Sequence, residues 1–251
     1  MLNYYRRISV RRARIPSVMP ATACPDDGYQ CTSDLCDGKG VCRHAQRSGP
    51  CDDGDPCTSN DSCFGGSCSG GTPVTCAPCL SCDGVLGCVP TLDTHCKQAG
   101  KSSIKLRDVK TERVTWKWLR GDHTSPQDLG NPQLATDYAF CIYDGTVDVN
   151  GNPGLLLGAR VPAGFSWKAK GSSFVYLAPD VIQVIRLRPG DDSKAKVLVK
   201  GKGSTLNLSP LQWIVLPVTV QLKGGNGLAC WKAEYNSATS SNERLFKAQS
   251  P

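Results

Sequence analysis

Two neighbouring stretches of the chain repeat one pattern: residues 24–42 read CPDDGYQCTSDLCDGKGVC, and residues 51–68 read CDDGDPCTSNDSCFGGSC. Each stretch has four cysteines, an Asp-Asp-Gly near the first cysteine and a Thr-Ser directly after the second. Asp-Gly pairs favour tight turns, because glycine accepts a positive φ and the aspartate side chain hydrogen-bonds to nearby backbone. The pattern therefore predicts a string of turns held together by disulfides.

A third, divergent unit follows, with the sequence CAPCLSCDGVLGC at residues 76–88 and a further cysteine at position 96. Few large aliphatic residues lie in this region, so disulfides must replace a hydrophobic core. We expect a disulfide-rich repeat module over residues 24–96. The cysteines expected in disulfides, with one of them unpaired, are Cys24, Cys31, Cys36, Cys42, Cys51, Cys57, Cys63, Cys68, Cys76, Cys79, Cys82, Cys88, Cys96, Cys141 and Cys230.

The phrase C-D-D-G-x-P-C-T, present at residues 51–58 and degenerate at residues 24–32, resembles the cysteine-rich repeat of slime-mould extracellular matrix proteins. Similar repeats occur in large secreted bacterial proteins, many of them from myxobacteria and their relatives. The resemblance covers residues 24–96, implies an extracellular structural or adhesive context, and is uninformative about any ligand. The first copy has Tyr29-Gln30 where the second has Asp55-Pro56, which leaves its disulfide pairing open.

The cysteine density requires an oxidising compartment, so we expect an extracellular or cell-surface protein. The segment 1–23 is rich in arginine, is expected to be disordered, and has no apolar run of the length that a signal peptide needs. No stretch approaches the length of a transmembrane span. We therefore expect that Met1 is not the true start, or that the chain is a fragment.

The composition changes after Cys96. Residues 97–103, KQAGKSS, are expected to be a polar linker, and from residue 104 apolar and polar residues alternate, as in Val114, Trp116 and Trp118. Nine or ten short runs of this kind, separated by Gly and Pro, predict an antiparallel β-sandwich over residues 104–247, with a jelly roll as an alternative. This part is similar to an uncharacterised β-rich domain that follows cysteine-rich modules in secreted bacterial proteins. Cys141 and Cys230 are expected to bridge its two ends.

Charge separates the two parts of the chain. Residues 24–96 carry a balance of −7 and residues 101–251 a balance of +8 within an overall charge of +7. Lysines such as Lys196 and Lys200 alternate with Val197 and Val199 along one predicted strand. Such lysines either serve solubility alone or contact an acidic polysaccharide or the acidic module.

Two groups of residues are candidate ligand sites. Trp116 and Trp118 share one strand face, so they form either core or, if exposed, a stacking platform for sugar rings. Asp52, Asp53 and Asp55 offer oxygen ligands for calcium, but their spacing is not that of an EF-hand and no bidentate Glu follows. No other cofactor is expected.

A zinc site is the alternative interpretation of the third cysteine unit. Cys76, Cys79 and Cys82 have ligand-like spacing, and Cys88, His95 and Cys96 lie near them in the sequence. In a reducing cytosol such a cluster would favour zinc, whereas the adjacent cysteine repeats favour disulfides. The sequence contains no phosphate loop, no dinucleotide fingerprint and no G-x-S-x-G, so we predict no enzyme.

The sequence thus favours a secreted or cell-surface structural or adhesive protein, in which a stapled stalk presents a β-sandwich interaction domain. The expected partners are extracellular matrix, polysaccharide or a surface protein, with no nucleic acid and no transmembrane segment. Two alternatives stay open: a carbohydrate-binding module that uses exposed tryptophans and basic residues, and a zinc-binding intracellular protein.

Overall fold

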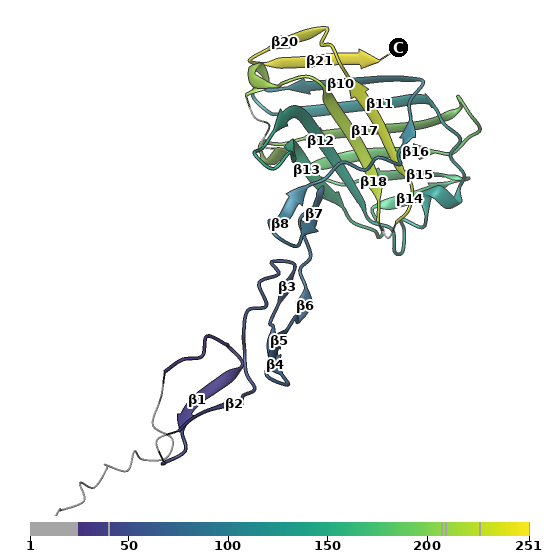
Figure 1. Cartoon of the computed structure of the whole chain (residues 1–251). Helices are drawn as coiled ribbons and strands as arrows, with labels where there is room; N and C mark the ends of the chain where they lie inside the picture. Colours follow the sequence, from purple (N-terminus) through teal and green to yellow (C-terminus); the bar gives the residue numbers. More distant parts are fainter. Residues whose placement is uncertain (1–24, 40, 207, 209, 226, 251) are drawn as a thin grey trace, which may run out of the picture. The chain divides into compact units, whose positions relative to one another are not determined.

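The structure is a computed structural model that describes residues 25–39, 41–206, 208, 210–225 and 227–250 (Figure 1). The segment 1–23 and Cys24 lie outside the described residues. The chain divides into two compact units, residues 1–74 and residues 75–251, and each is described by itself. The regular secondary structure of both is mainly antiparallel β-strand. No helix in the described part of the chain is long and apolar enough to cross a membrane.

The first unit consists of short two-stranded sheets that follow the sequence repeats. The pairs are β1–β2, β3–β6 and β4–β5, all antiparallel. The strands are β1 (Thr32–Cys36), β2 (Cys42–Gln46), β3 (Thr58–Ser59), β4 (Ser62–Phe64), β5 (Ser67–Ser69) and β6 (Thr72–Pro73).

The repeated Asp-Asp-Gly forms the same turn in both copies. The carboxylate of Asp26 accepts the N–H of Gly28 at 2.8 Å, and that of Asp52 accepts the N–H of Gly54 at 2.9 Å. Both glycines have a positive φ, 82° and 81°, which glycine adopts without steric cost. The sequence repeat is therefore a structural repeat, built from side-chain-to-backbone turns as its residues predict.

The second unit contains a hairpin and two larger sheets. The hairpin is β7 (Leu80–Asp83) with β8 (Gly87–Pro90). The larger sheet has the order β14-β15-β16-β17-β11-β10-β21-β20, and the smaller one β13-β12-β18-β19-β9. The strands of the larger sheet are β10 (Lys101–Arg107), β11 (Arg113–Gly121), β14 (Trp167–Lys170), β15 (Ser173–Leu177), β16 (Ile182–Arg188), β17 (Ala195–Lys202), β20 (Ser240–Asn242) and β21 (Leu245–Ser250).

The smaller sheet is antiparallel except for its edge, where β9 pairs parallel with β19. Its strands are β9 (Lys97–Gln98), β12 (Tyr138–Val147), β13 (Pro153–Val161), β18 (Val218–Gly224) and β19 (Cys230–Tyr235). Three 3₁₀ turns complete the described second unit: η1 (Gln127–Leu129), η2 (Ser204–Leu206) and η3 (Leu211–Trp213).

One hydrophobic cluster takes residues from both larger sheets of the second unit. Trp116 from β11 and Trp231 from β19 are both 0% exposed, and the Trp116 indole N–H donates to the hydroxyl of Tyr235 at 3.2 Å. Alternation of apolar and polar residues thus produced strands with one buried face, as predicted. The expectation of a mostly antiparallel β domain is confirmed, while its finer description as a sandwich or jelly roll stays a prediction.

The boundary between the units differs from the one expected at residue 96. It lies between Val74 and Thr75, so the third cysteine unit belongs with the β domain. The expected linker 97–103 is also absent: its residues contribute strand β9 and the start of β10. Composition could not reveal this, because the third unit is as rich in cysteine and turn residues as the repeats before it.

The expected Cys141–Cys230 bridge is wrong. Cys141 is bonded to Cys79 and Cys230 to Cys96. Strand β18 lies between β12, which carries Cys141, and β19, which carries Cys230. Strands two places apart are separated by about 10 Å, beyond the roughly 7 Å between Cα atoms that a disulfide can span. Each cysteine instead bonds to the third cysteine unit.

Polar contacts hold the third cysteine unit on the smaller sheet. The fully buried amide of Gln221 accepts the Asp93 N–H at 3.1 Å and donates to the Asp93 carbonyl at 2.7 Å. The Tyr143 hydroxyl donates to the Thr91 carbonyl at 2.8 Å, and the Lys223 ammonium donates to the same carbonyl at 2.6 Å. Burial lowers the pKa of Lys223. These residues alternate with core residues along β12 and β18, so the third unit covers the face of the smaller sheet opposite the core.

Candidate functional site

The candidate site lies on the face of the larger sheet that points away from the core. The eight strands of this sheet contain no Asp or Glu. Their Lys and Arg residues are Lys101, Lys105, Arg107, Arg113, Lys117, Arg120, Lys168, Lys170, Arg186, Arg188, Lys196, Lys200, Lys202 and Lys247. The sheet therefore places cations next to one another without carboxylates between them.

Strand periodicity separates these cations from the core. On β16, Ile185 and Leu187 are fully buried, whereas Arg186 and Arg188 are exposed. Strand β17 follows the same rule, with exposed Lys196 beside buried residues. Successive side chains on a strand point to opposite faces of the sheet, so burial of the apolar set fixes the basic set on the other face.

Strand register aligns the cations in a row across five strands. Lys117 on β11 lies opposite Leu198 on β17, which lies opposite Arg186 on β16. Arg186 lies opposite Val175 on β15, which lies opposite Lys168 on β14. Cations on alternate strands are about 10 Å apart, because neighbouring strands are about 4.8 Å apart. The row therefore alternates a positive charge with an aliphatic side chain.

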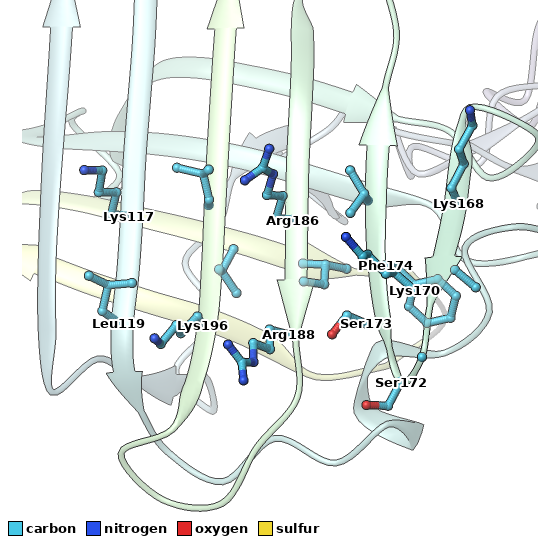
Figure 2. A pocket seen from close by; sticks show the side chains of 16 residues that line it. Lys117, Leu119, Lys168, Lys170, Ser172, Ser173, Phe174, Arg186, Arg188 and Lys196 are labelled. Carbon is cyan, nitrogen blue, oxygen red and sulfur yellow. The ribbon is translucent and has the colours of Figure 1, made fainter.

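A second row lies beside the first, and a groove runs over both (Figure 2). In this row Leu119 lies opposite Lys196, which lies opposite Arg188. The groove has a volume of about 1170 Å³, more than the roughly 300–1,000 Å³ of typical small-molecule pockets. Its cations, labelled in Figure 2, are Lys117, Lys168, Lys170, Arg186, Arg188 and Lys196.

The cations of the groove are not neutralised by neighbouring carboxylates. Among the described residues, none of these six side chains takes part in an ion pair. Elsewhere in the same unit, Lys97 pairs with Asp128 at 3.2 Å, and Arg160 pairs with Asp137. A groove lined by charges of one sign concentrates counter-ions of the opposite sign, so this surface attracts anions.

Of the two interpretations of Trp116 and Trp118, the sugar platform is wrong and the core interpretation is confirmed, because both side chains are 0% exposed. The Trp118 indole donates to the Lys232 carbonyl at 3.0 Å, so its polar group is satisfied inside the domain. The exposed tryptophan is Trp213, at 69%. It lies on η3, before strand β18, and sequence reasoning did not single it out as a ligand residue.

The calcium candidates come together only in part. Carboxylate oxygens of Asp52, Asp53 and Asp61 lie within 4.8 Å of one another, and Asp55 is not in this group. The Asp55 carboxylate instead accepts the N–H of Cys57 at 2.8 Å. Asp61 accepts the N–H of Gly71 at 2.9 Å, and this bond lowers the pKa of Asp61. These carboxylates already accept backbone N–H groups, which accounts for them without an ion.

The zinc candidates are used in disulfides. Cys76 is bonded to Cys88, Cys79 to Cys141 and Cys96 to Cys230. Cys82 is also disulfide-bonded. Zinc requires thiolates, which a disulfide does not offer, so these residues do not fit a zinc site.

A His–Asp cluster in the first repeat gives a prediction about pH. The ring of His44 contacts the Asp34 carboxylate and lies 3.2 Å from that of Asp27. The Asp34 hydrogen bond and both negative charges raise the pKa of His44. We expect the His44 ring to titrate above its ordinary value of about 6.5. The contact between His44 and Asp34 should stabilise the β1–β2 hairpin fully at pH values below about 6.5, the pKa of histidine in the unfolded chain. This stabilisation should be lost as the pH rises through the folded-state pKa of His44.

Histidine ring signals followed by NMR against pH would measure this pKa. Asp34→Asn should lower the pKa of His44, while Asp83→Asn, in the other unit, should leave it unchanged. A wild-type His44 that titrates at or below 6.5 would contradict the contact.

Comparison of the chain with protein-family models, curated proteins and solved structures found no match. The function of this chain is therefore inferred from the groove and from the disulfide pattern.

Proposed function

We propose that this chain is an extracellular or cell-surface adhesive protein whose disulfide-stapled repeats carry a β domain that binds an acidic polysaccharide in its basic groove. The observation that supports it best is the row of cations on Lys117, Arg186 and Lys168, set on a hydrogen-bonded sheet and free of ion pairs. A rigid array of this kind needs little ordering when a charged ligand binds.

The disulfides support the extracellular location. Bonded cysteines occur in both units, for example Cys51–Cys68 in the first and Cys96–Cys230 in the second. Such bonds persist in oxidising compartments and are rare in the cytosol. The resemblance of the repeats to those of extracellular matrix proteins points the same way. We also infer that the two larger sheets form a sandwich, since both contribute to one hydrophobic cluster.

The chemistry of the groove favours a polymer with carboxylate or sulfate groups. Arg186 and Arg188 can each offer two parallel N–H donors to such a group, and the lysines act as point charges. Leu198 and Val175, between the cations, can contact the apolar faces of sugar rings. Cations about 10 Å apart on alternate strands suit an extended polymer on which acidic groups recur along the chain.

A single-stranded nucleic acid fits the groove less well. Proteins of that class combine basic residues with aromatic side chains on which bases stack. The aromatic residue of this groove is Phe174, which is partly buried and packs against the core. A polysaccharide does not need base stacking, so it is the ligand class that the residues favour.

Charge neutralisation tests this function. A variant with Arg186→Gln, Arg188→Gln and Lys196→Gln should bind heparin or polygalacturonate oligosaccharides about tenfold or more weakly, since exposed ion pairs contribute about 0.2–1 kcal/mol each. Isothermal titration calorimetry at several salt concentrations would measure the affinity, which should fall as salt screens the charges.

The matched control removes three exposed cations outside the groove, with Lys39→Gln, Lys110→Gln and Arg244→Gln. It has the same net charge as the groove variant and should bind nearly as well as the wild type. Equal loss in both variants would mean attraction by net charge alone. Failure of the wild type to bind either oligosaccharide, or tighter binding of single-stranded DNA, would overturn the proposal.

A further inference from the structure

The three repeat units are the cysteine-rich stretches at residues 24–42, 51–68 and 76–88, and their cysteines occupy equivalent positions. In each unit the third and fourth cysteines lie directly opposite each other in a two-stranded hairpin. These pairs are Cys36 with Cys42, Cys63 with Cys68, and Cys82 with Cys88. The units can therefore be compared cysteine by cysteine, although their loops differ in length.

The first cysteine of a unit bonds within that unit. Cys51, the first cysteine of the second repeat unit, is bonded to the fourth, Cys68. Cys76, the first of the third unit, is bonded to its fourth, Cys88. The same connection in two units makes the first-to-fourth bond a rule of the repeat.

The second cysteine of a unit bonds forward along the chain. Cys31, the second cysteine of the first repeat unit, is bonded to Cys63, the third cysteine of the second repeat unit. The Cα–Cα distance is 5.2 Å. Cys79, the second of the third unit, is bonded to Cys141 on β12, so the β domain replaces a following repeat there. A third cysteine, as Cys63 shows, accepts the second cysteine of the unit before it.

A paired amide accompanies this joint between units. The side chain of Gln30, next to Cys31, accepts the Asp52 N–H at 2.9 Å and donates to the Asp52 carbonyl at 3.1 Å. Cys31 and Cys63 are 2% and 7% exposed. The joint is therefore a packed contact between consecutive repeats and not a bond between two loose loops.

Cys36 is the third cysteine of the first repeat unit, and it is free and half-buried. Two aliphatic residues beside it, Leu35 and Val41, are 39% and 54% exposed. The second repeat unit has Ser62 and Ser67 at the matching places, and its exposed apolar residue, Phe64 at 83%, follows Cys63 instead. The first hairpin thus holds a free cysteine at the place where, in the second hairpin, Cys63 already forms the joint with Cys31.

We propose that Cys36 is the attachment point for another repeat of the same kind, whose second cysteine forms a disulfide with it. The added repeat would extend the stalk by one repeat unit. Two thiols lose two protons and two electrons in this step. An oxidised disulfide, such as glutathione disulfide or a disulfide-carrying oxidoreductase, takes them up and becomes two thiols. The repeat can lie earlier in a longer polypeptide or on a second molecule.

An added repeat tests the proposal. A copy of residues 51–75 is placed directly before Cys24, because those residues directly precede Cys76 in the chain. The third cysteine of the copy is replaced by serine, so that its second cysteine is the one left for Cys36. After oxidative folding in a glutathione buffer, unreduced peptides are mapped by mass spectrometry. We expect a peptide that joins Cys36 to the second cysteine of the copy, and loss of alkylation at Cys36.

Two variants serve as controls. With Cys36→Ser, the second cysteine of the copy should become fully alkylatable. With Cys36→Ser and Ser67→Cys together, a thiol offered in the second repeat unit should not restore the bond. Polysaccharide binding should be unchanged in Cys36→Ser, which separates this proposal from that of the groove.

Supplying the copy as a separate polypeptide distinguishes the two sources of the repeat. A bond only in the fused form indicates a repeat of the same chain, and a bond in both forms indicates that molecules can be cross-linked. Cys36 that stays alkylatable in both forms, with the copy folded, would overturn the proposal.

Discussion

Removing the Cys96–Cys230 disulfide, with Cys96→Ala and Cys230→Ala, should lower the free energy of unfolding of the β domain by about 5 kcal/mol. The bond joins residues 134 positions apart, so it restricts a large part of the unfolded chain. It also fixes β9 beside β19 and the third cysteine unit on the smaller sheet. Urea denaturation followed by tryptophan fluorescence would measure the loss, and every tryptophan lies beyond residue 100 in the second unit.

The control for this prediction is the short bridge Cys76–Cys88, which joins residues 12 positions apart. Its removal, with Cys76→Ala and Cys88→Ala, should cost about 3 kcal/mol or less by the same dependence on loop length. An unchanged urea midpoint for the long-bridge variant, or a smaller loss than in the short-bridge variant, would contradict the anchoring of the third unit.

Trp118→Ala should destabilise the β domain by about 3–5 kcal/mol, the usual cost of deleting a buried large aromatic side chain. Trp118 is 0% exposed, and its ring lies against Gly121, where an added Cβ would approach the ring to 1.7 Å. The variant also leaves the carbonyl of Lys232 without its indole donor. Thermal and urea unfolding would both report the loss.

Trp213→Ala is the matched control, since Trp213 is 69% exposed. Surface substitutions of this kind change stability by about 0.5 kcal/mol or less. A Trp118→Ala protein with wild-type stability and reduced sugar binding would restore the platform interpretation, which the burial of Trp118 rejects.

Local patterns predicted the elements better than their assembly. Alternation around Val114 and Trp116 was sufficient for an antiparallel strand, because it depends on neighbours in the sequence. The repeated Asp-Asp-Gly was sufficient for its turns, because the hydrogen bonds of Asp26 and Asp52 are local. The disulfide of Cys141 depends instead on which strands are adjacent, and a sequence without aligned relatives carries little information on that.

The candidate site was hidden for the same reason. Lys196 and Lys200 could be recognised as one side of a strand, but Lys117 and Lys168 reach the same groove from strands far away in the sequence. Alternation also cannot tell which face of a strand is buried. For that reason Trp116 and Trp118 could be placed on one face, but only packing against the smaller sheet identified that face as core.

The most direct test of the central claim is chemical-shift mapping of backbone amides while polygalacturonate oligosaccharide is added to the full chain. We expect saturable shifts on β11, β14, β16 and β17, centred on Lys117, Arg186 and Lys196, with few on the smaller sheet. Shifts confined to the smaller sheet or to the first compact unit, or no saturable shifts at all, would contradict an acidic polysaccharide site in the groove.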